Sequence, residues 1–107
     1  MIRYNKYKNK KVTVNGITYD SIKECNRHQE LILCERAGFI AELKHQVPFI
    51  LFEKSEHGRV VKYIADFTYK MPDGRLVVED VKGVKTDVYK LKKRIMAEKY
   101  GINIKET

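Results

Sequence analysis

Two strand-like runs joined by a tight turn, within residues 60–82, constrain the fold of this chain more than any other stretch. The turn is the sequence MPDG at residues 71–74, where proline presets φ for the second turn position and glycine accepts a positive φ. Each run holds an acid among apolar neighbours, Asp66 in the first and Asp80 in the second. We therefore expect a hairpin that carries one carboxylate on each of two adjacent strands.

Side-chain alternation in the second run predicts which of its two acids faces the same way as the lysine that follows. Successive side chains of a strand point to opposite faces, which puts Asp80 and Lys82 on one face and Glu79 on the other. A bulge in this strand would instead bring Glu79 into the place of Asp80. Two carboxylates and a lysine favour metal-assisted chemistry, and a structural network of ion pairs is the alternative.

Length and composition are those of one small globular domain that comprises residues 1–107. Hydrophobic residues make up 43% of the chain, which allows a modest core and argues against disorder. No apolar run approaches the roughly 20 residues that a membrane-spanning helix needs, and the first residues lack the apolar segment of a signal peptide. We therefore expect no membrane partner and a cytoplasmic location.

The charge balance indicates a polyanionic partner. Lysine and arginine number 22 against 14 acids, a formal net charge of +8, and such an excess favours nucleic acid. Residues 1–11 form a basic arm in which tyrosines alternate with cations, a mixture suited to phosphates and bases. The arm residues that we expect on DNA are Arg3, Lys6, Lys8, Lys10 and Lys11. A solvated terminus would have a similar composition.

Local signals predict a β-hairpin followed by a helix. The dipeptide NG at residues 15–16, between two β-branched runs, predicts a hairpin over residues 12–19. Ser21 and Glu24 match the capping-box pattern, and the helix should continue over residues 21–37 before a glycine ends it. Glu24 is then either a capping residue or a functional acid.

Apolar spacing predicts the buried faces of two helices. In the first helix the expected buried stripe is Ile22, Cys25, Ile32, Leu33 and Ala37, with Glu24, His28 and Glu35 outside it. A second helix is expected over residues 86–100, capped by Thr86 and ended by Gly101. Its expected stripe is Val84, Val88, Leu91 and Ile95.

The remaining runs predict strands at residues 39–43 and 46–52, the two strands of residues 60–82, and a short last strand at residues 102–104. The predicted order is therefore hairpin, helix, three or more strands, helix and strand. This order gives an α/β (α+β) fold with the hairpin of residues 12–19 in front of a core at residues 20–104.

The acids and the lysine carry a family resemblance. Asp66 followed by DVK at residues 80–82 resembles the D…(D/E)xK signature of the PD-(D/E)xK nuclease superfamily, which has a restriction-endonuclease-like αβββαβ core. The runs YIADF at residues 63–67 and VEDVKG at residues 78–83 are similar to a small family of phage-borne endonucleases that resemble Holliday-junction resolvases. The likeness extends over roughly residues 8–101.

The resemblance implies roles for particular residues of a catalytic metal site. Asp66 and Asp80 would bind Mg²⁺, or Mn²⁺, with help from the backbone carbonyl of Val81. Lys82 would be the catalytic lysine. Glu24 would match a helical glutamate that binds metal through water or as a second-site ligand.

The same resemblance implies a metal-dependent, structure-specific DNA endonuclease that cleaves Holliday junctions or other branched DNA as a homodimer. It would act in the cytoplasm of a bacterial or phage-infected cell. Two residues depart from the family pattern, since Ala65 stands in place of proline and Asp80 in place of the longer glutamate. Gln46 and Lys93 are further candidates, for the site and for a phosphate, although a strand-edge residue and a solvated helix face are the simpler readings.

Two other functions stay open at this point. One is a nicking or flap-type DNA endonuclease of the same fold, with a different choice of substrate. The other is a DNA-binding module without catalytic activity, against which the intact set of Asp66, Asp80 and Lys82 argues. The sequence does not distinguish a DNA substrate from RNA, because no feature reads a 2′-hydroxyl.

Overall fold

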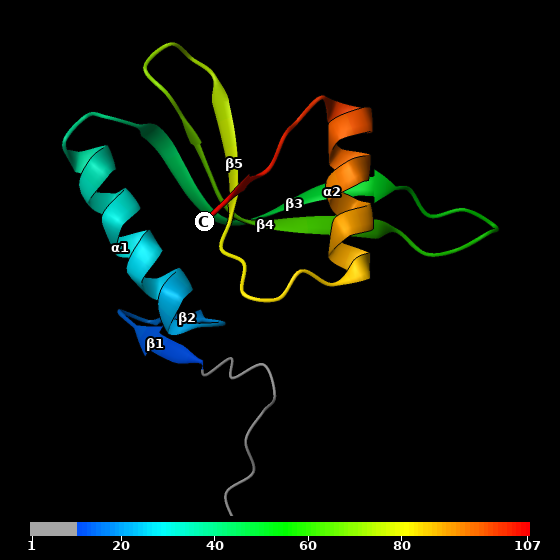
Figure 1. The fold of residues 1–107 in the computed structure, drawn as a ribbon, viewed down its shortest axis with the longest axis horizontal. Coiled ribbons are helices and arrows are strands. Elements are labelled where there is room, and N and C mark those ends of the chain that lie inside the picture. The colour runs from blue at the N-terminus through cyan, green and yellow to red at the C-terminus, as the bar shows by residue number, and fades with distance from the viewer. Residues whose placement is uncertain (1–10) are drawn as a thin grey trace, which may run out of the picture.

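The computed structural model describes residues 11–107 and shows over them an α+β fold, as predicted. A two-stranded ribbon precedes a four-stranded mixed sheet that is accompanied by two helices (Figure 1). In chain order the elements are β1 (Val12–Val14), β2 (Ile17–Tyr19), α1 (Ile22–Arg36), β3 (Ala41–Phe52), β4 (Val61–Lys70), β5 (Leu76–Asp80), α2 (Asp87–Tyr100) and β6 (Lys105–Glu106).

The larger sheet has the strand order β3-β4-β5-β6. Its first two pairs are antiparallel, and β5 pairs with β6 in parallel. Figure 1 shows that β3 and β4 change direction midway, so that one half of this long hairpin extends towards α1 and the other half lies beside α2. The two helices therefore cover different parts of the same pair of strands.

Two apolar clusters form the core, one under each helix. The cluster at α2 contains Ala65 of β4 together with Met96. The cluster at α1 contains Phe67 of β4 together with Leu31. Ala65 and Phe67 are two residues apart and so lie on the same face of β4. Ala65 packs in the cluster at α2 and Phe67 in the cluster at α1. The helix that covers this face of β4 therefore changes between these two residues. Asp66 lies between them, at the changeover.

Residue type determines both predicted turns. Asn15 and Gly16 join β1 to β2 with φ values of 52° and 80°, which asparagine and glycine adopt more readily than other residues. Between β4 and β5, Gly74 has a φ of 88° and its N–H donates to the Met71 carbonyl at 2.8 Å. Both hairpins are confirmed.

The predicted ends of the helices are also confirmed. Ser21 Oγ accepts from the Glu24 N–H at 3.0 Å, and Thr86 Oγ1 accepts from the Tyr89 N–H at 3.1 Å. These bonds satisfy N–H groups that have no partner within a first helical turn. At the end of α2, Gly101 takes the left-handed conformation, with a φ of 66°, and stops the helix.

The predicted buried faces of the helices are largely wrong. The buried residues are Glu24, Cys25, His28 and Leu31 in α1, and Tyr89 and Met96 in α2. The exposed residues include Ile22, Leu33 and Ala37 of the first predicted stripe and Val84, Val88 and Leu91 of the second. Apolar spacing assigns glutamate and histidine to the surface, but Glu24 and His28 are buried here because each has hydrogen-bond partners inside the fold.

The strands predicted at residues 39–43 and 46–52 are one strand, β3. Glu42 and Gln46 have positive φ values of 54° and 58°. The register with β4 shifts between Ala41 and Lys44, around Glu42, but it continues unchanged past Gln46, so the pairing does not end. The last strand is Lys105–Glu106 rather than residues 102–104. Ile104 is buried in the cluster at α2 instead.

Candidate active site

A cavity of about 490 Å³ lies where α1 begins and β5 ends. It receives residues from α1, from β4 and from the segment that leads out of β5 towards α2. Its lining comprises Asp20, Ser21, Lys23, Glu24, Asp66, Val81, Lys82, Gly83, Val84 and Thr86. Four of the residues predicted for the site are thus in its wall, and the fifth, Asp80, contacts Lys82.

Asp66 of β4 is half-buried and is held by two donors. The Val81 N–H donates to Asp66 Oδ2 at 2.8 Å, and Gln46 Nε2 donates to Oδ1 at 3.2 Å. Val81 thus meets Asp66 through its N–H, whereas the resemblance implied a role for its carbonyl. Burial, together with the hydrogen bond and the charge of Asp80, raises the pKa of Asp66 to about 8. Two carboxylates this close repel each other unless a proton or a cation neutralises one of them.

Asp80 is buried, with 2% of its surface exposed. The Tyr63 hydroxyl donates to Asp80 Oδ2 at 2.5 Å, and Lys82 Nζ lies 3.3 Å from the same oxygen. Burial and the hydrogen bond to Asp80 raise the pKa of Tyr63, so its hydroxyl stays a donor. Lys82 Nζ also lies 4.2 Å from the centre of the Tyr89 ring, a cation–π contact that steadies the ammonium beside Asp80.

Glu79 faces away from this cavity, as the alternation of β5 predicts. Arg27 of α1 holds its carboxylate with Nε and Nη2 at 2.6 and 3.0 Å, and the Tyr69 hydroxyl donates to it at 2.6 Å. Burial alone would raise the pKa of Glu79, but these hydrogen bonds outweigh it and lower the pKa. The β4–β5 register continues through Glu79 without a shift, so no bulge exchanges Glu79 for Asp80.

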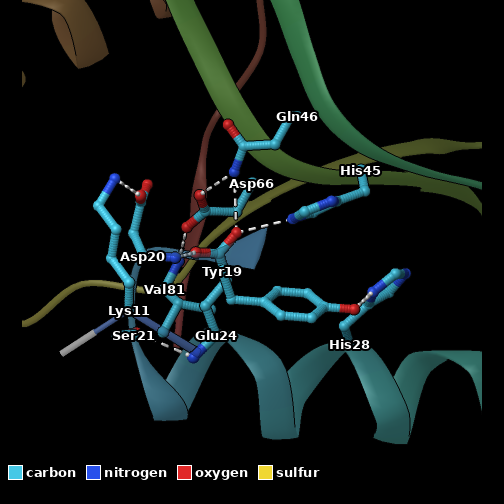
Figure 2. A network of polar contacts seen from close by, with 10 residues as sticks. All are labelled: Lys11, Tyr19, Asp20, Ser21, Glu24, His28, His45, Gln46, Asp66 and Val81. Carbon is cyan, nitrogen blue, oxygen red and sulfur yellow. Dashed lines mark hydrogen bonds and ion pairs between the residues drawn. The ribbon is translucent and has the colours of Figure 1, made fainter. Parts of the chain in front are cut away.

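Glu24 is both a capping residue and a member of the cavity wall, because its two oxygens have different partners (Figure 2). Oε1 accepts from the Asp20 N–H at 3.1 Å, which closes the first turn of α1. Oε2 lies 2.7 Å from His45 Nε2 and accepts from Gln46 Nε2 at 2.8 Å. The capping role and the site role are therefore compatible, and Gln46 joins Glu24 to Asp66.

A row of rings behind Glu24 was not predicted. The Tyr19 hydroxyl lies 2.5 Å from His28 Nδ1, and the rings of His28 and His45 stack with their centres 4.9 Å apart. Burial and the neighbouring His45 lower the pKa of His28, which favours its neutral form. One signal was in the sequence, since His28 follows Glu24 by four residues on the same side of α1. The place of His45 depends on how β3 packs against α1, which sequence spacing does not give.

Lys23 is a cation of the cavity wall that sequence reasoning missed. Its Nζ lies 3.4 Å from the Lys82 carbonyl oxygen, so the first turn of α1 and the segment after β5 each bring a lysine to the same opening. Cations at the mouth and acids within suit a phosphodiester that approaches a bound metal. Nothing in the local sequence of Lys23 indicates a site residue, so only the folded structure shows its place in the cavity wall.

Of the cations predicted to bind DNA, one lies beside the cavity wall, one lies on α2 outside that wall, and the others lie outside the described residues. Lys11 is exposed and its Nζ is 3.7 Å from Asp20 Oδ1. Lys93 of α2 has its Nζ 3.2 Å from Glu106 Oε2. The other predicted cations, Arg3, Lys6, Lys8 and Lys10, are outside the residues that the structure describes.

The donor set of the cavity fits a hard divalent cation. Within residues 11–107 no three His, Cys, Asp or Glu side chains form a ready-made metal cluster. Mg²⁺ needs less, because one or two carboxylates suffice when water and phosphate oxygens complete the octahedron. Asp66 and Asp80 are such carboxylates, and Glu24 adds a third oxygen donor across the cavity. An all-oxygen set suits Mg²⁺ or Mn²⁺ better than zinc.

Fold and site together define a small α+β protein with an acidic cavity whose wall carries Lys23 and Lys82. The cavity lies beside the point on β4 where the covering helix changes from α2 to α1. The chain belongs to the family described as "Protein of unknown function (DUF1064)", whose model matches residues 4–107. No curated protein and no solved structure matches the chain. None of the helices in residues 11–107 has the length and apolar character to cross a membrane.

Proposed function

We propose that this protein is a Mg²⁺-dependent, structure-specific DNA endonuclease that cleaves branched DNA such as Holliday junctions. The observation that supports the proposal most is that Asp66 and Lys82 share one cavity wall, with the buried Asp80 in contact with Lys82 and with Lys23 as a second lysine at the opening. The net charge of +8 favours DNA as the partner. When bound, Mg²⁺ would supply a nucleophilic water and neutralise charge on the phosphate.

The acids have the task of holding the metal in a fixed place. Asp66 and Asp80 would provide the carboxylate oxygens, and both are oriented before any metal arrives. The Val81 N–H fixes one oxygen of Asp66, and the Tyr63 hydroxyl fixes one oxygen of Asp80. Rigid ligands on adjacent strands keep the metal aligned with the phosphate. Glu24 would act from the helix side, through water or at a second metal.

Lys82 is suited to stabilise the transition state. Its ammonium is anchored by Asp80 and by the Tyr89 ring, so it can donate hydrogen bonds to the attacking water and to a non-bridging phosphate oxygen. Negative charge grows on that oxygen as the phosphodiester is attacked, and a fixed donor stabilises it there without reorganisation. Lys23 would hold the phosphate of a neighbouring nucleotide at the mouth of the cavity.

Symmetric cleavage of a junction requires two active sites, and we propose that the protein acts as a C2 homodimer. Such an enzyme would work in the cytoplasm of a bacterial or phage-infected cell, where branched DNA arises. The exposed Lys11, beside the cavity wall, and Lys93 of α2 would contact phosphates that flank the cleavage site.

The substrate is tested with a panel of end-labelled four-way junctions, flaps, nicked duplexes and linear duplexes. We expect Mg²⁺ to support cleavage of the junction in preference to linear duplex, and EDTA to abolish it. Preferential cleavage of nicked or flap DNA would support the corresponding alternative endonuclease. Binding of the junction without cleavage, and without heat of Mg²⁺ or Mn²⁺ binding in calorimetry, would contradict the proposal and indicate a non-catalytic DNA-binding module.

The role of Lys23 gives a separate expected result. Lys23→Ala should weaken junction binding and reduce the slope of log K against log salt concentration by about 0.9, the contribution of one phosphate contact. Lys54→Ala is the matched control, because it removes the same charge from an exposed loop that is not part of the cavity wall. Salt titrations followed by fluorescence anisotropy measure both slopes. Equal slopes for Lys23→Ala and the wild type would rule out this contact.

A further inference from the structure

Gln46 has a backbone conformation that its residue type disfavours. Its φ is 58°, in the left-handed region that glycine and asparagine adopt most readily. The residues on both sides of it keep the regular register with β4, and the same register sets Gln46 opposite Asp66. Backbone strain of this kind persists where surrounding contacts hold it, and it is found at functional sites. The side chain of Gln46 shows what holds it.

The amide of Gln46 bridges two acids of the cavity wall (Figure 2). Its Nε2 donates to Glu24 Oε2 at 2.8 Å and to Asp66 Oδ1 at 3.2 Å. A primary amide nitrogen carries two hydrogens, and Glu24 Oε2 and Asp66 Oδ1 each accept one of them, so one nitrogen can serve both acids. Glu24 belongs to α1 and Asp66 to β4. A single side chain therefore lies between two acids that come from different elements.

We propose that the Gln46 amide is a placeholder for the metal. The amide occupies the space between Glu24 and Asp66, and it moves aside when a divalent cation binds. This inference rests on the proposed function, because it requires that the cavity bind such a cation. The partial positive charge of the amide hydrogens offsets part of the repulsion between the two acids. A divalent cation offsets it more strongly, so it can displace the amide.

The remaining contacts of the two acids allow such an exchange without loss of order. When the amide leaves, Glu24 keeps the Asp20 N–H on Oε1 and the His45 ring on Oε2. Asp66 keeps the Val81 N–H on Oδ2. Each acid therefore stays oriented while Asp66 Oδ1 becomes free for a cation. The row of rings behind His45 explains why Glu24 does not swing away with the amide.

A placeholder lowers the apparent metal affinity, because the cation binds only the fraction of molecules in which the amide has moved aside. Removing the amide should therefore tighten metal binding, whereas removing a metal ligand would weaken it. The sign of the change separates the two roles. A merely structural role for Gln46 predicts no change in metal affinity once the backbone strain is accounted for.

The test compares Gln46→Gly with Glu42→Gly. Both replacements suit a positive φ in the same strand, since Glu42 has a φ of 54°, but of the two only Gln46→Gly removes an amide that donates to Glu24 and Asp66. Calorimetric titration with Mn²⁺ and Mg²⁺ should give Gln46→Gly an affinity at least about tenfold above that of the wild type, as expected when the open state is a minor one. Glu42→Gly should bind metal as the wild type does.

Two further readouts do not depend on activity. In EDTA, Gln46→Gly should have a lower thermal midpoint than Glu42→Gly, and added Mg²⁺ should raise the midpoint of Gln46→Gly more. In the wild type, the side-chain amide resonances of Gln46 should shift when Mg²⁺ is added. Metal binding that is equal or weaker in Gln46→Gly would overturn the placeholder alone. A wild-type protein that binds neither metal would overturn the proposed function, and the placeholder with it.

Discussion

Asp80→Asn is expected to reduce junction cleavage in Mg²⁺ by about a thousandfold or more, the scale on which enzymes lose activity when a key electrostatic group is removed. Asparagine keeps the shape of the side chain and an oxygen that can accept from the Tyr63 hydroxyl, so the local packing survives. What disappears is the negative charge that would hold the metal and pair with Lys82. Time courses on a labelled four-way junction measure the loss.

Two controls separate loss of chemistry from loss of structure. Asp73→Asn removes an acid from the exposed β4–β5 turn while keeping an acceptor for the Arg75 N–H, and it should cleave like the wild type. Asp80→Asn itself should bind the junction in Ca²⁺ about as tightly as the wild type and should not unfold earlier, because it removes one of two mutually repelling carboxylates. Undiminished cleavage by Asp80→Asn would exclude Asp80 from the metal site.

Arg27→Ala is expected to lower the free energy of unfolding by about 3 kcal/mol, because it leaves the charge of Glu79 buried without its ionic partner. Glu79 has no exposed surface, and Arg27 holds both of its oxygens. We expect the lower end of the usual range, since the Arg27 side chain is 24% exposed and the hydroxyl of Tyr69 still donates to the carboxylate. Urea unfolding followed by circular dichroism gives the value.

The pH dependence of this deficit has a definite sign. In the wild type the pKa of Glu79 is lowered, so its contribution is complete above the unfolded pKa of about 4.3 and is lost as pH falls through the lower folded value. Without Arg27, burial dominates and the pKa of Glu79 should rise, so acid neutralises the buried charge in the variant first. The loss of unfolding free energy in Arg27→Ala, relative to the wild type, should therefore become smaller as the pH falls from neutral to about 5.

The matched control for this pair is Arg59→Ala, which removes an arginine from the exposed β3–β4 loop. Surface substitutions of this kind usually stay within about 0.5 kcal/mol. If Arg27→Ala lost no more stability than Arg59→Ala at neutral pH, Glu79 would not depend on Arg27 for its burial. Cleavage activity is a useful second readout, because Glu79 faces away from the cavity and a folded Arg27→Ala should still cut the junction.

Local signals in the sequence predict the parts of this fold that local chemistry decides. Turns at Gly16 and Gly74 and helix ends at Ser21 and Gly101 depend on φ preferences and on capping within a few residues, so they are confirmed. The buried stripes depend instead on what each helix meets. Leu33 is apolar and 62% exposed, because α1 turns its polar face, with Glu24 and His28, towards the sheet.

The residues of the site follow the same rule: those placed by the local sequence are predicted, and those placed by contacts between elements are not. Alternation in β5 is local, and it places Asp80 and Lys82 together and Glu79 apart, as predicted. Contacts across elements are not local, so the row of rings that ends at His45 and the lysine at Lys23 were not predicted. The sequence makes Gln46 only a minor candidate, because it predicts an ordinary strand there and gives no sign of the left-handed φ.

The change from α2 to α1 as the helix that covers β4 has a consequence for how the protein unfolds when heated. Proteins open in cooperative units with different local stabilities, and here the cluster under α1 and the cluster under α2 are two natural units. Glu24 belongs to the first unit, while the Tyr89 ring that steadies Lys82 belongs to the second. Opening of either unit dismantles the cavity, so the weaker half alone sets the temperature range in which the site exists.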